Sequence, residues 1–168
     1  PRPRTRDRPF SRVVLDLPAG RDVSMTREQI LAAIPHRPPM LLLDEITESG
    51  NDTIVCGRTF SGEEFFFQGH FPEAPIVPGV ILCEMALQAG ALLLARHYQD
   101  GRAEEGELPL ATRLNNVKFK RMVRPGDTVQ VAVQIRERLA NAFFLSARLT
   151  CEEELTASLD FACTMAAR

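Results

Sequence analysis

The sequence contains no tryptophan, one tyrosine and only three histidines among its 168 residues. None of its four cysteines forms a C-x-x-C pair or stands at zinc-ligand spacing from a histidine. A metal site and a redox pair are therefore not indicated, and we expect no metal or organic cofactor. The cysteines all lie among apolar neighbours, as reduced core thiols do, so we expect a cytoplasmic protein. They are Cys56, Cys83, Cys151 and Cys163.

A long hydrophobic run is also missing. The longest apolar stretch, residues 80–95, is interrupted by Glu84 and Gln88 and is shorter than the roughly 20 residues of a spanning helix. The start of the chain is rich in proline and arginine and has no apolar segment of the kind found in signal peptides. The formal net charge is −2, so total charge does not indicate a nucleic-acid partner. We expect no membrane insertion and no nucleic-acid binding.

Residues 1–23 differ in composition from the rest of the chain. The first nine residues read PRPRTRDRP, with arginines alternating with residues that interrupt regular structure. Such a segment cannot bury apolar surface, so we expect a mobile or extended tail. A basic arm for an anionic partner is the alternative, and residues 10–17 contain a short apolar run that could add a strand.

Residues 24–168 have the pattern of one α+β domain. A short helix is expected after Thr26, ended by Pro35, and a long helix from about residue 78 to 98. Because the long helix is apolar on all sides, it must be surrounded by protein. The predicted architecture is an antiparallel sheet wrapped around this helix. The predicted strands are residues 40–46, 53–60, 110–120, 128–139, 142–152 and 155–166.

The segment between Gly69 and Gly79, GHFPEAPIVPG, is the most unusual part of the sequence. Its prolines recur every third residue, which favours an extended path, and Pro78 is suited to the first turn of the long helix. Gly79 permits a close approach of another molecule to the backbone. The free N–H groups of this helix N-terminus suit an oxygen that becomes negative during a reaction.

Glu84 follows within the same apolar helix, with Gln88 one turn further on the same face. A carboxyl group in such surroundings loses hydration, so its pKa should rise, as a general acid near neutral pH requires. Taken alone, His70 could be structural and Glu84 could be paired with an arginine. Together with the helix N-terminus they form a base, an acid and an oxyanion donor, which is a recognisable catalytic arrangement.

The same residues carry a resemblance to a known family. The stretch FFQGHFP (residues 66–72), followed by Pro75, Pro78-Gly79-Val80 and residues 84–88, closely resembles the 3-hydroxyacyl-acyl-carrier-protein dehydratases of bacterial type II fatty acid synthesis, and more narrowly the FabZ type. Further matches are IPHRPPMLLLD (residues 34–44), KFKR (118–121) and PGD (125–127). The likeness runs from about residue 26 to 165. Residues 62–67 lack the Asn-Glu-Pro pattern common in the family, and the tail before Ser24 is longer than usual.

This resemblance implies a hot-dog fold and assigns His70 as catalytic histidine and Glu84 as catalytic carboxylate. The FabA type carries aspartate where this chain has Glu84, so the FabZ type is favoured. The resemblance also implies a homodimer with shared active sites, in which His70 of one subunit meets Glu84 of the other, or a trimer of such dimers.

The mechanism expected from these assignments is an elimination. His70 removes the α-proton of a 3-hydroxyacyl thioester, Glu84 protonates the leaving hydroxyl, and the Gly79 N–H stabilises the enolate-like oxygen. Gln88 orients Glu84 or a water. Substrate contacts are expected at Phe71, Val77 and Pro78, and the candidate linings of an apolar acyl tunnel are Phe65, Phe66, Phe67, Phe71, Ile76 and Val77.

Basic residues after the loop are candidates for binding the acidic acyl carrier protein. They are Lys118, Lys120, Arg121 and Arg124, with Arg113 a weaker candidate. The alternative is that they form an ordinary solvated strand face. His36 and Arg37 are expected to shape the fold, and His97 to lie at the surface.

Two other functions compete with dehydration. A hot-dog thioesterase binds similar acyl thioesters but attacks them with water, and the spacing of His70 and Glu84 does not favour it. A non-catalytic acyl-binding subunit is the alternative from another class, and the intact His70, Gly79 and Glu84 speak against it.

Overall fold

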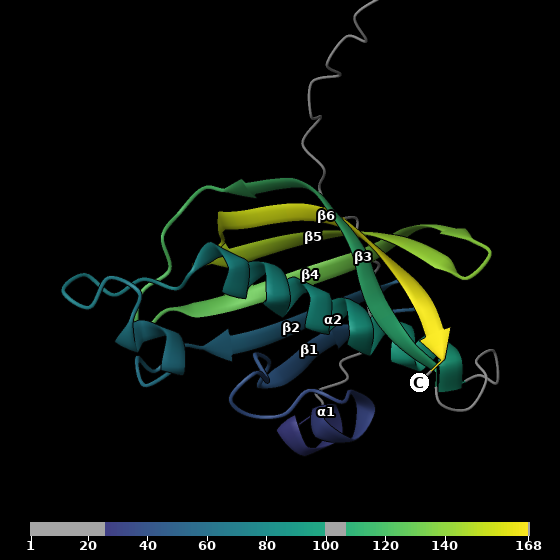
Figure 1. Ribbon diagram of the computed structural model, residues 1–168, viewed down its shortest axis with the longest axis horizontal. Helices are drawn as coiled ribbons and strands as arrows, with labels where there is room; N and C mark the ends of the chain where they lie inside the picture. Colours follow the sequence, from purple (N-terminus) through teal and green to yellow (C-terminus); the bar gives the residue numbers. More distant parts are fainter. Residues whose placement is uncertain (1–25, 100–106, 168) are drawn as a thin grey trace, which may run out of the picture.

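The computed structural model describes residues 26–99 and 107–167, and the predicted tail (1–23) with its possible strand (10–17) lies outside them. The long helix α2 (Gly79–Gln99) crosses the concave face of a six-stranded antiparallel sheet (Figure 1). This arrangement confirms the predicted α+β architecture. The other elements are α1 (Arg27–Ala33), β1 (Glu45–Ser49), β2 (Thr53–Thr59), the 3-10 helix η1 (Phe65–Gln68), β3 (Glu107–Phe119), β4 (Thr128–Leu139), β5 (Ala142–Cys151) and β6 (Glu154–Ala167). The strand order is β1-β2-β4-β5-β6-β3.

The strands β4, β5 and β6 form a meander through two tight turns. Burial alternates along β5, residue by residue, because one face packs on α2 and the other faces solvent. Leu139 pairs with Ala142 and Cys151 with Glu154, so each connection has two residues. Glu152 and Glu153 both have positive φ, as a two-residue turn compatible with strand twist requires.

Helix α2 is buried along most of its length, which explains why its sequence is apolar on all sides. Gly90 packs closely against side chains of the sheet. A Cβ at this position would lie 2.7 Å from Cζ of Phe161, a fully buried ring of β6. In the part of the chain that the structure describes, no helix has both the length and the apolar character to span a bilayer.

The predicted strand at residues 40–46 is wrong, because β1 begins only at Glu45. Leu41, Leu42 and Leu43 are buried, as the apolar run suggested. Their backbone, however, is not paired with a strand. The Leu41 N–H donates to the Arg37 carbonyl (3.0 Å), the Leu41 carbonyl accepts from Arg58 (3.3 Å), and the Leu42 N–H donates to Oε1 of Gln88 (2.8 Å). A short apolar run shows burial but cannot show which groups will bond the backbone.

Among the strands between residues 26 and 167 that the structure describes, β3 stands at the edge of the sheet, beside β6. Every residue from 110 to 120 is exposed, although several are large and apolar. A bulge lies between Asn115 and Lys118, where Asn116 has a φ of 51° and its side-chain amide donates to Asp160 (2.7 Å). A long, exposed and apolar edge strand is typical of a surface that pairs with another chain. Its exposed apolar residues are Leu110, Leu114, Val117 and Phe119.

The close contact at Gly90 predicts that alanine at this position will destabilise the protein, although alanine favours helices. Gly90→Ala should lower the free energy of unfolding by about 1–2 kcal/mol, because displacement of the Phe161 ring outweighs the roughly 1 kcal/mol that alanine gains in a helix. Thermal and chemical denaturation measure the change. Gly69→Ala is the matched control, because a Cβ at Gly69 meets no atom within 4 Å. Equal or higher stability of Gly90→Ala would contradict the tight contact.

Candidate active site

His70 follows η1 and is held by backbone contacts on both sides. Its N–H donates to the carbonyl of Phe66 (3.0 Å), and its ring Nδ1 lies 2.9 Å from the carbonyl oxygen of Ile76. Because a carbonyl oxygen only accepts, Nδ1 of the neutral ring must carry the proton. Nε2 is left with its lone pair, which is the tautomer that a general base needs.

The loop from Phe71 to Pro78 is partly different from the expected extended path. Residues 72–74 form a turn, with a φ of 54° at Phe71 and a bond from the Ala74 N–H to the Phe71 carbonyl (2.8 Å). Residues 75–78 follow without a turn or other regular structure. Phe71 is exposed and its ring stands edge-on to the His70 ring at 4.5 Å between centroids, whereas Val77 is buried in the core.

A partly buried ion-pair network supports the segment that leads to His70. Arg58 donates to Glu64 (3.0 Å) and to Asp44 (3.3 Å), and the side chains of Arg58 and Glu64 are only 11% and 9% exposed. Burial pushes the pKa of Glu64 upward, but the N–H groups of Ser61 and Gly62 and the Arg58 guanidinium outweigh it, so the pKa is lowered. Glu64 therefore anchors the turn directly before η1 as a carboxylate.

Glu84 projects from the second turn of α2 and is fixed by Gln88. The Gln88 amide is fully buried: its Oε1 accepts from the Leu42 N–H, and its Nε2 donates to the Met40 carbonyl (2.7 Å) and to Oε1 of Glu84 (2.9 Å). These partners leave only one orientation of the amide, so Oε1 of Glu84 is an acceptor. Because the carbonyl oxygen of a carboxylic acid is a better acceptor than its hydroxyl oxygen, this contact favours a transferable proton on Oε2.

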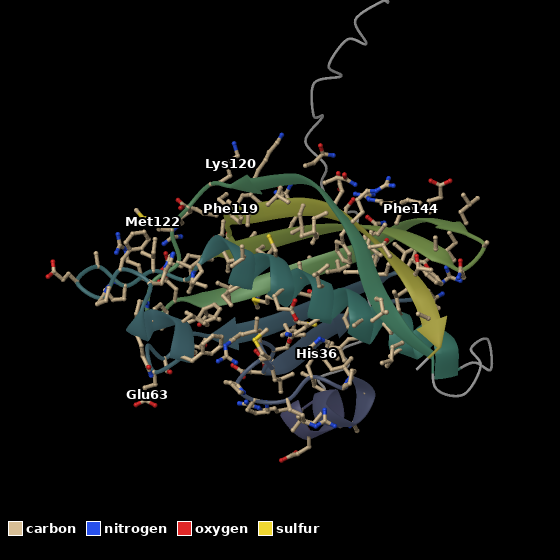
Figure 2. The ribbon with its side chains drawn as sticks, viewed as in Figure 1. His36, Glu63, Phe119, Lys120, Met122 and Phe144 are labelled. Carbon is tan, nitrogen blue, oxygen red and sulfur yellow. The ribbon has the colours of Figure 1, made fainter. Side chains whose placement is uncertain are left out.

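The surroundings of Glu84 differ from those expected. Its side chain is 26% exposed, so the structure does not enclose it fully, and its nearest basic neighbour is His36 instead of an arginine. Nε2 of His36 lies 3.6 Å from Oε1 of Glu84. In Figure 2, His36 lies between α2 and α1, below the middle of the long helix.

Glu84 and His36 face a cavity of about 540 Å³ between α1, α2 and β3. Among the described residues that line this cavity they are the polar side chains, so the cavity suits an apolar chain with a polar group at one place. None of the aromatic residues predicted to line an acyl tunnel belongs to this wall. The other lining residues are Ala32, Ala33, Ile34, Pro35, Leu87, Ala91, Ala95, Leu108, Pro109, Leu110, Ala111 and Met165.

Gly79 begins α2 as predicted, but the space beside its Cα, which was expected to be open to another molecule, is occupied by a side chain of the same chain. The ring of Phe119, at the end of β3, fills the space: a Cβ on Gly79 would lie 2.7 Å from its Cζ. The helical hydrogen bonds begin with the Ile81 N–H, which donates to the Pro78 carbonyl (2.9 Å). The Gly79 N–H lies before this first bond. It is one of the N–H groups at a helix N-terminus that have no carbonyl partner within the helix.

The four predicted carrier-protein residues lie together after the bulge of β3 but have different surroundings. Arg121 is held by Glu152 (3.0 Å), Glu154 (3.4 Å) and the Cys151 carbonyl (3.0 Å). Lys120 points outward from the end of β3 (Figure 2). Lys118 and Arg124 are exposed as well, whereas the Arg121 guanidinium is held by these three contacts.

Comparison with known proteins places this geometry in a family. Residues 34–159 match the FabA-like domain. The chain belongs to the FabA-like family. The 3-hydroxyacyl-[acyl-carrier-protein] dehydratase FabZ of Petrotoga mobilis is 38% identical over 136 residues, which are 81% of this chain and 94% of that protein. The FabZ of Streptococcus pyogenes serotype M5 is 37% identical over 83% of this chain and 99% of its own length.

Solved structures with lower sequence identity support the hot-dog fold. The dehydratase heterocomplex ApeI:P from Xenorhabdus doucetiae has a TM-score of 0.69 at 15% identity, covering 83% of this chain and 91% of that one. The E. coli PaaI protein from the phenylacetic acid degradation operon has a TM-score of 0.56 at 16% identity, covering 71% and 80%. The hot-dog fold implied by the family resemblance is confirmed.

Three side chains around the site were not predicted from the sequence. His36 was assigned to the fold, although it lies in the IPHRPPM motif that carries the family resemblance. Glu64 and Arg58 were not singled out, because a buried ion pair between a strand and a following turn has no sequence pattern of its own. The side chain of His97 lies outside the described residues.

The lowered pKa of Glu64 predicts a pH-dependent contribution to stability. The carboxylate should stabilise the fold fully above about pH 4.5, the ordinary value for glutamate, and lose this effect as the pH falls through its lower folded-state pKa. Glu64→Gln should therefore lower the free energy of unfolding by about 2 kcal/mol at pH 7. Denaturation at several pH values measures this difference, which should shrink toward pH 3. A difference independent of pH would disprove the role of the charge.

Proposed function

We propose that this protein dehydrates (3R)-3-hydroxyacyl-acyl-carrier-protein to trans-2-enoyl-acyl-carrier-protein in type II fatty acid biosynthesis. The observation that carries the proposal is the pair of prepared groups, a His70 ring with Nε2 unprotonated and a Glu84 carboxyl whose Oε1 is fixed by Gln88. The dehydratase names of relatives that share more than a third of its residues support the same reaction.

The reaction needs one proton removed and one supplied. Nε2 of His70 takes the α-proton, and the electrons of this C–H bond form the double bond between Cα and Cβ. The bond from Cβ to the hydroxyl breaks as Oε2 of Glu84 delivers its proton, and water leaves. The Gly79 N–H, with the helix dipole behind it, stabilises the thioester oxygen while negative charge builds on it. A net proton transfer from His70 to Glu84 restores the enzyme.

The substrate consists of an apolar chain and an acidic carrier, and each has a candidate place. The cavity beside Glu84 suits the acyl chain, because the described residues of its wall other than Glu84 and His36 are apolar. Lys118, Lys120 and Arg124 suit the carrier protein by charge. Arg121 contributes less to this surface, because Glu152 and Glu154 already neutralise it.

The active unit in this proposal is a homodimer with shared sites. The exposed edge of β3 supports pairing with a second copy, since no described strand pairs with its outer side and several of its side chains are apolar. In such a dimer His70 of one subunit would work with Glu84 of the other.

Removal of either reacting group should abolish the reaction without unfolding the protein. His70→Ala and Glu84→Gln are each expected to lower kcat at least about 100-fold, because general acid–base groups contribute factors of 10²–10⁴. The assay follows enoyl-carrier-protein formation, with circular dichroism to confirm the fold. Native rates in both variants would disprove the assignment. Free acid as the product would indicate a thioesterase, and binding of acyl-pantetheine without turnover a non-catalytic subunit.

Shared sites predict complementation between two inactive proteins. In a mixed dimer of His70→Ala and Glu84→Gln chains, one of the two sites has both native groups. Random reassociation makes about half of the dimers mixed, so roughly a quarter of the native activity should return. The measurement is activity after the two variants are unfolded and refolded together, with each refolded alone as the control. No recovery from demonstrated mixed dimers would show that both groups act within one chain.

A further inference from the structure

We infer that His36 is a positioning residue that, together with Gln88, determines which oxygen of Glu84 carries the proton. The inference rests on the proposed function of Glu84 as the acid. Nε2 of His36 lies 3.6 Å from Oε1 of Glu84, the same oxygen that accepts from Nε2 of Gln88 at 2.9 Å. Two N–H groups from separate elements therefore converge on one carboxyl oxygen.

The backbone around His36 is held in place. The guanidinium of Arg37 folds back and donates from Nη1 to the carbonyls of Ile34 (2.7 Å) and His36 (2.8 Å). The N–H groups of Met40 and Leu41 both donate to the Arg37 carbonyl (2.9 and 3.0 Å). The imidazole is thus presented to the cavity from an ordered connection between α1 and β1.

The surroundings of the two ring nitrogens select one tautomer. Nδ1 of His36 is buried and has no hydrogen-bond partner among the described residues. A proton on Nδ1 would leave a buried N–H without an acceptor and would turn a lone pair of Nε2 toward Glu84. A proton on Nε2 avoids both costs and points at Oε1. His36 is therefore a donor to Glu84, the reverse of His70, whose Nδ1 carries the proton.

The effect of this donor should fall on the chemical step. As Oε2 of Glu84 releases its proton to the leaving hydroxyl, the carboxyl group becomes negative, and hydrogen bonds to an ionised acceptor are about twice as strong as neutral ones. The separation of 3.6 Å is longer than a hydrogen bond and is expected to shorten as charge develops. An interaction strengthened only in the transition state raises kcat and leaves KM nearly unchanged.

Two substitutions separate this donor from the bulk of the ring. His36→Phe keeps a ring but removes the N–H, and it breaks no bond at Nδ1 because none is present. We expect kcat to fall roughly 10- to 100-fold, the range for a hydrogen bond to a charged group, with KM changed less than about twofold. His36→Gln places an amide N–H close to the position of Nε2 and should restore kcat to within about fivefold of native.

A double-mutant cycle with Glu84→Gln tests whether His36 acts through Glu84. In that background His36→Phe should have no further effect on the residual rate, because no transferable proton remains to be placed. A full additional loss would show that His36 acts independently of Glu84. If the native protein forms no enoyl product, the proposed function fails; if it is active and His36→Phe keeps native kcat, only the inference about His36 fails.

A measurement on the native protein decides the tautomer even if a variant does not fold. Nitrogen-15 NMR of the histidine rings should show Nε2 of His36 protonated and Nδ1 unprotonated, with the opposite pattern for His70. A proton on Nδ1 of His36 would overturn the inference, because Nε2 could then not donate to Glu84.

Discussion

The fully buried side-chain amide of Gln88 is the interaction on which the active site depends. Its carbonyl oxygen and its NH₂ group bind the backbone of Leu42 and Met40, so it ties the segment between α1 and β1 to the long helix. The same NH₂ group donates to Glu84. Leaving any one of these polar groups buried without a partner would lower the stability of the protein by about 1–3 kcal/mol. The orientation of the Glu84 carboxyl, the proposed acid, is therefore maintained by the same hydrogen bonds that close the core.

A second network supports the side of the site that carries His70, and one residue touches both sides. Arg58 donates to the Leu41 carbonyl, between the two backbone groups that Gln88 binds, and also to Glu64, which anchors the turn before η1. The segments that position Glu84 and His70 therefore share a buried cation. This arrangement allows both groups to be oriented before substrate arrives, which is what acid–base catalysis at fixed geometry requires.

Regular patterns in the sequence predicted the regular parts of the fold. The bounds of β4 agree at both ends with the predicted strand, and those of β5 and β6 agree within one residue, because half-buried strands alternate in burial and end at turn residues. The segment of Leu41 to Leu43 was assigned to a strand because it is apolar. Its backbone partners include the side chains of Gln88 and Arg58, which lie elsewhere in the chain and leave no periodic signal.

The sequence by itself determined the family and the hot-dog fold that follows from it. It also identified His70, Glu84 and Gln88 as candidate site residues, because all three belong to the motif that carries the family resemblance. Only the tertiary structure decided how the groups are oriented. Gln88 and Met40 are 48 residues apart, and His36 is equally remote from Glu84 in the chain. The tautomers of His36 and His70, and the oxygen of Glu84 that can carry a proton, depend on which partners folding brings within a few ångströms. Local sequence does not encode these contacts, because they form only when α1, α2 and the sheet pack together.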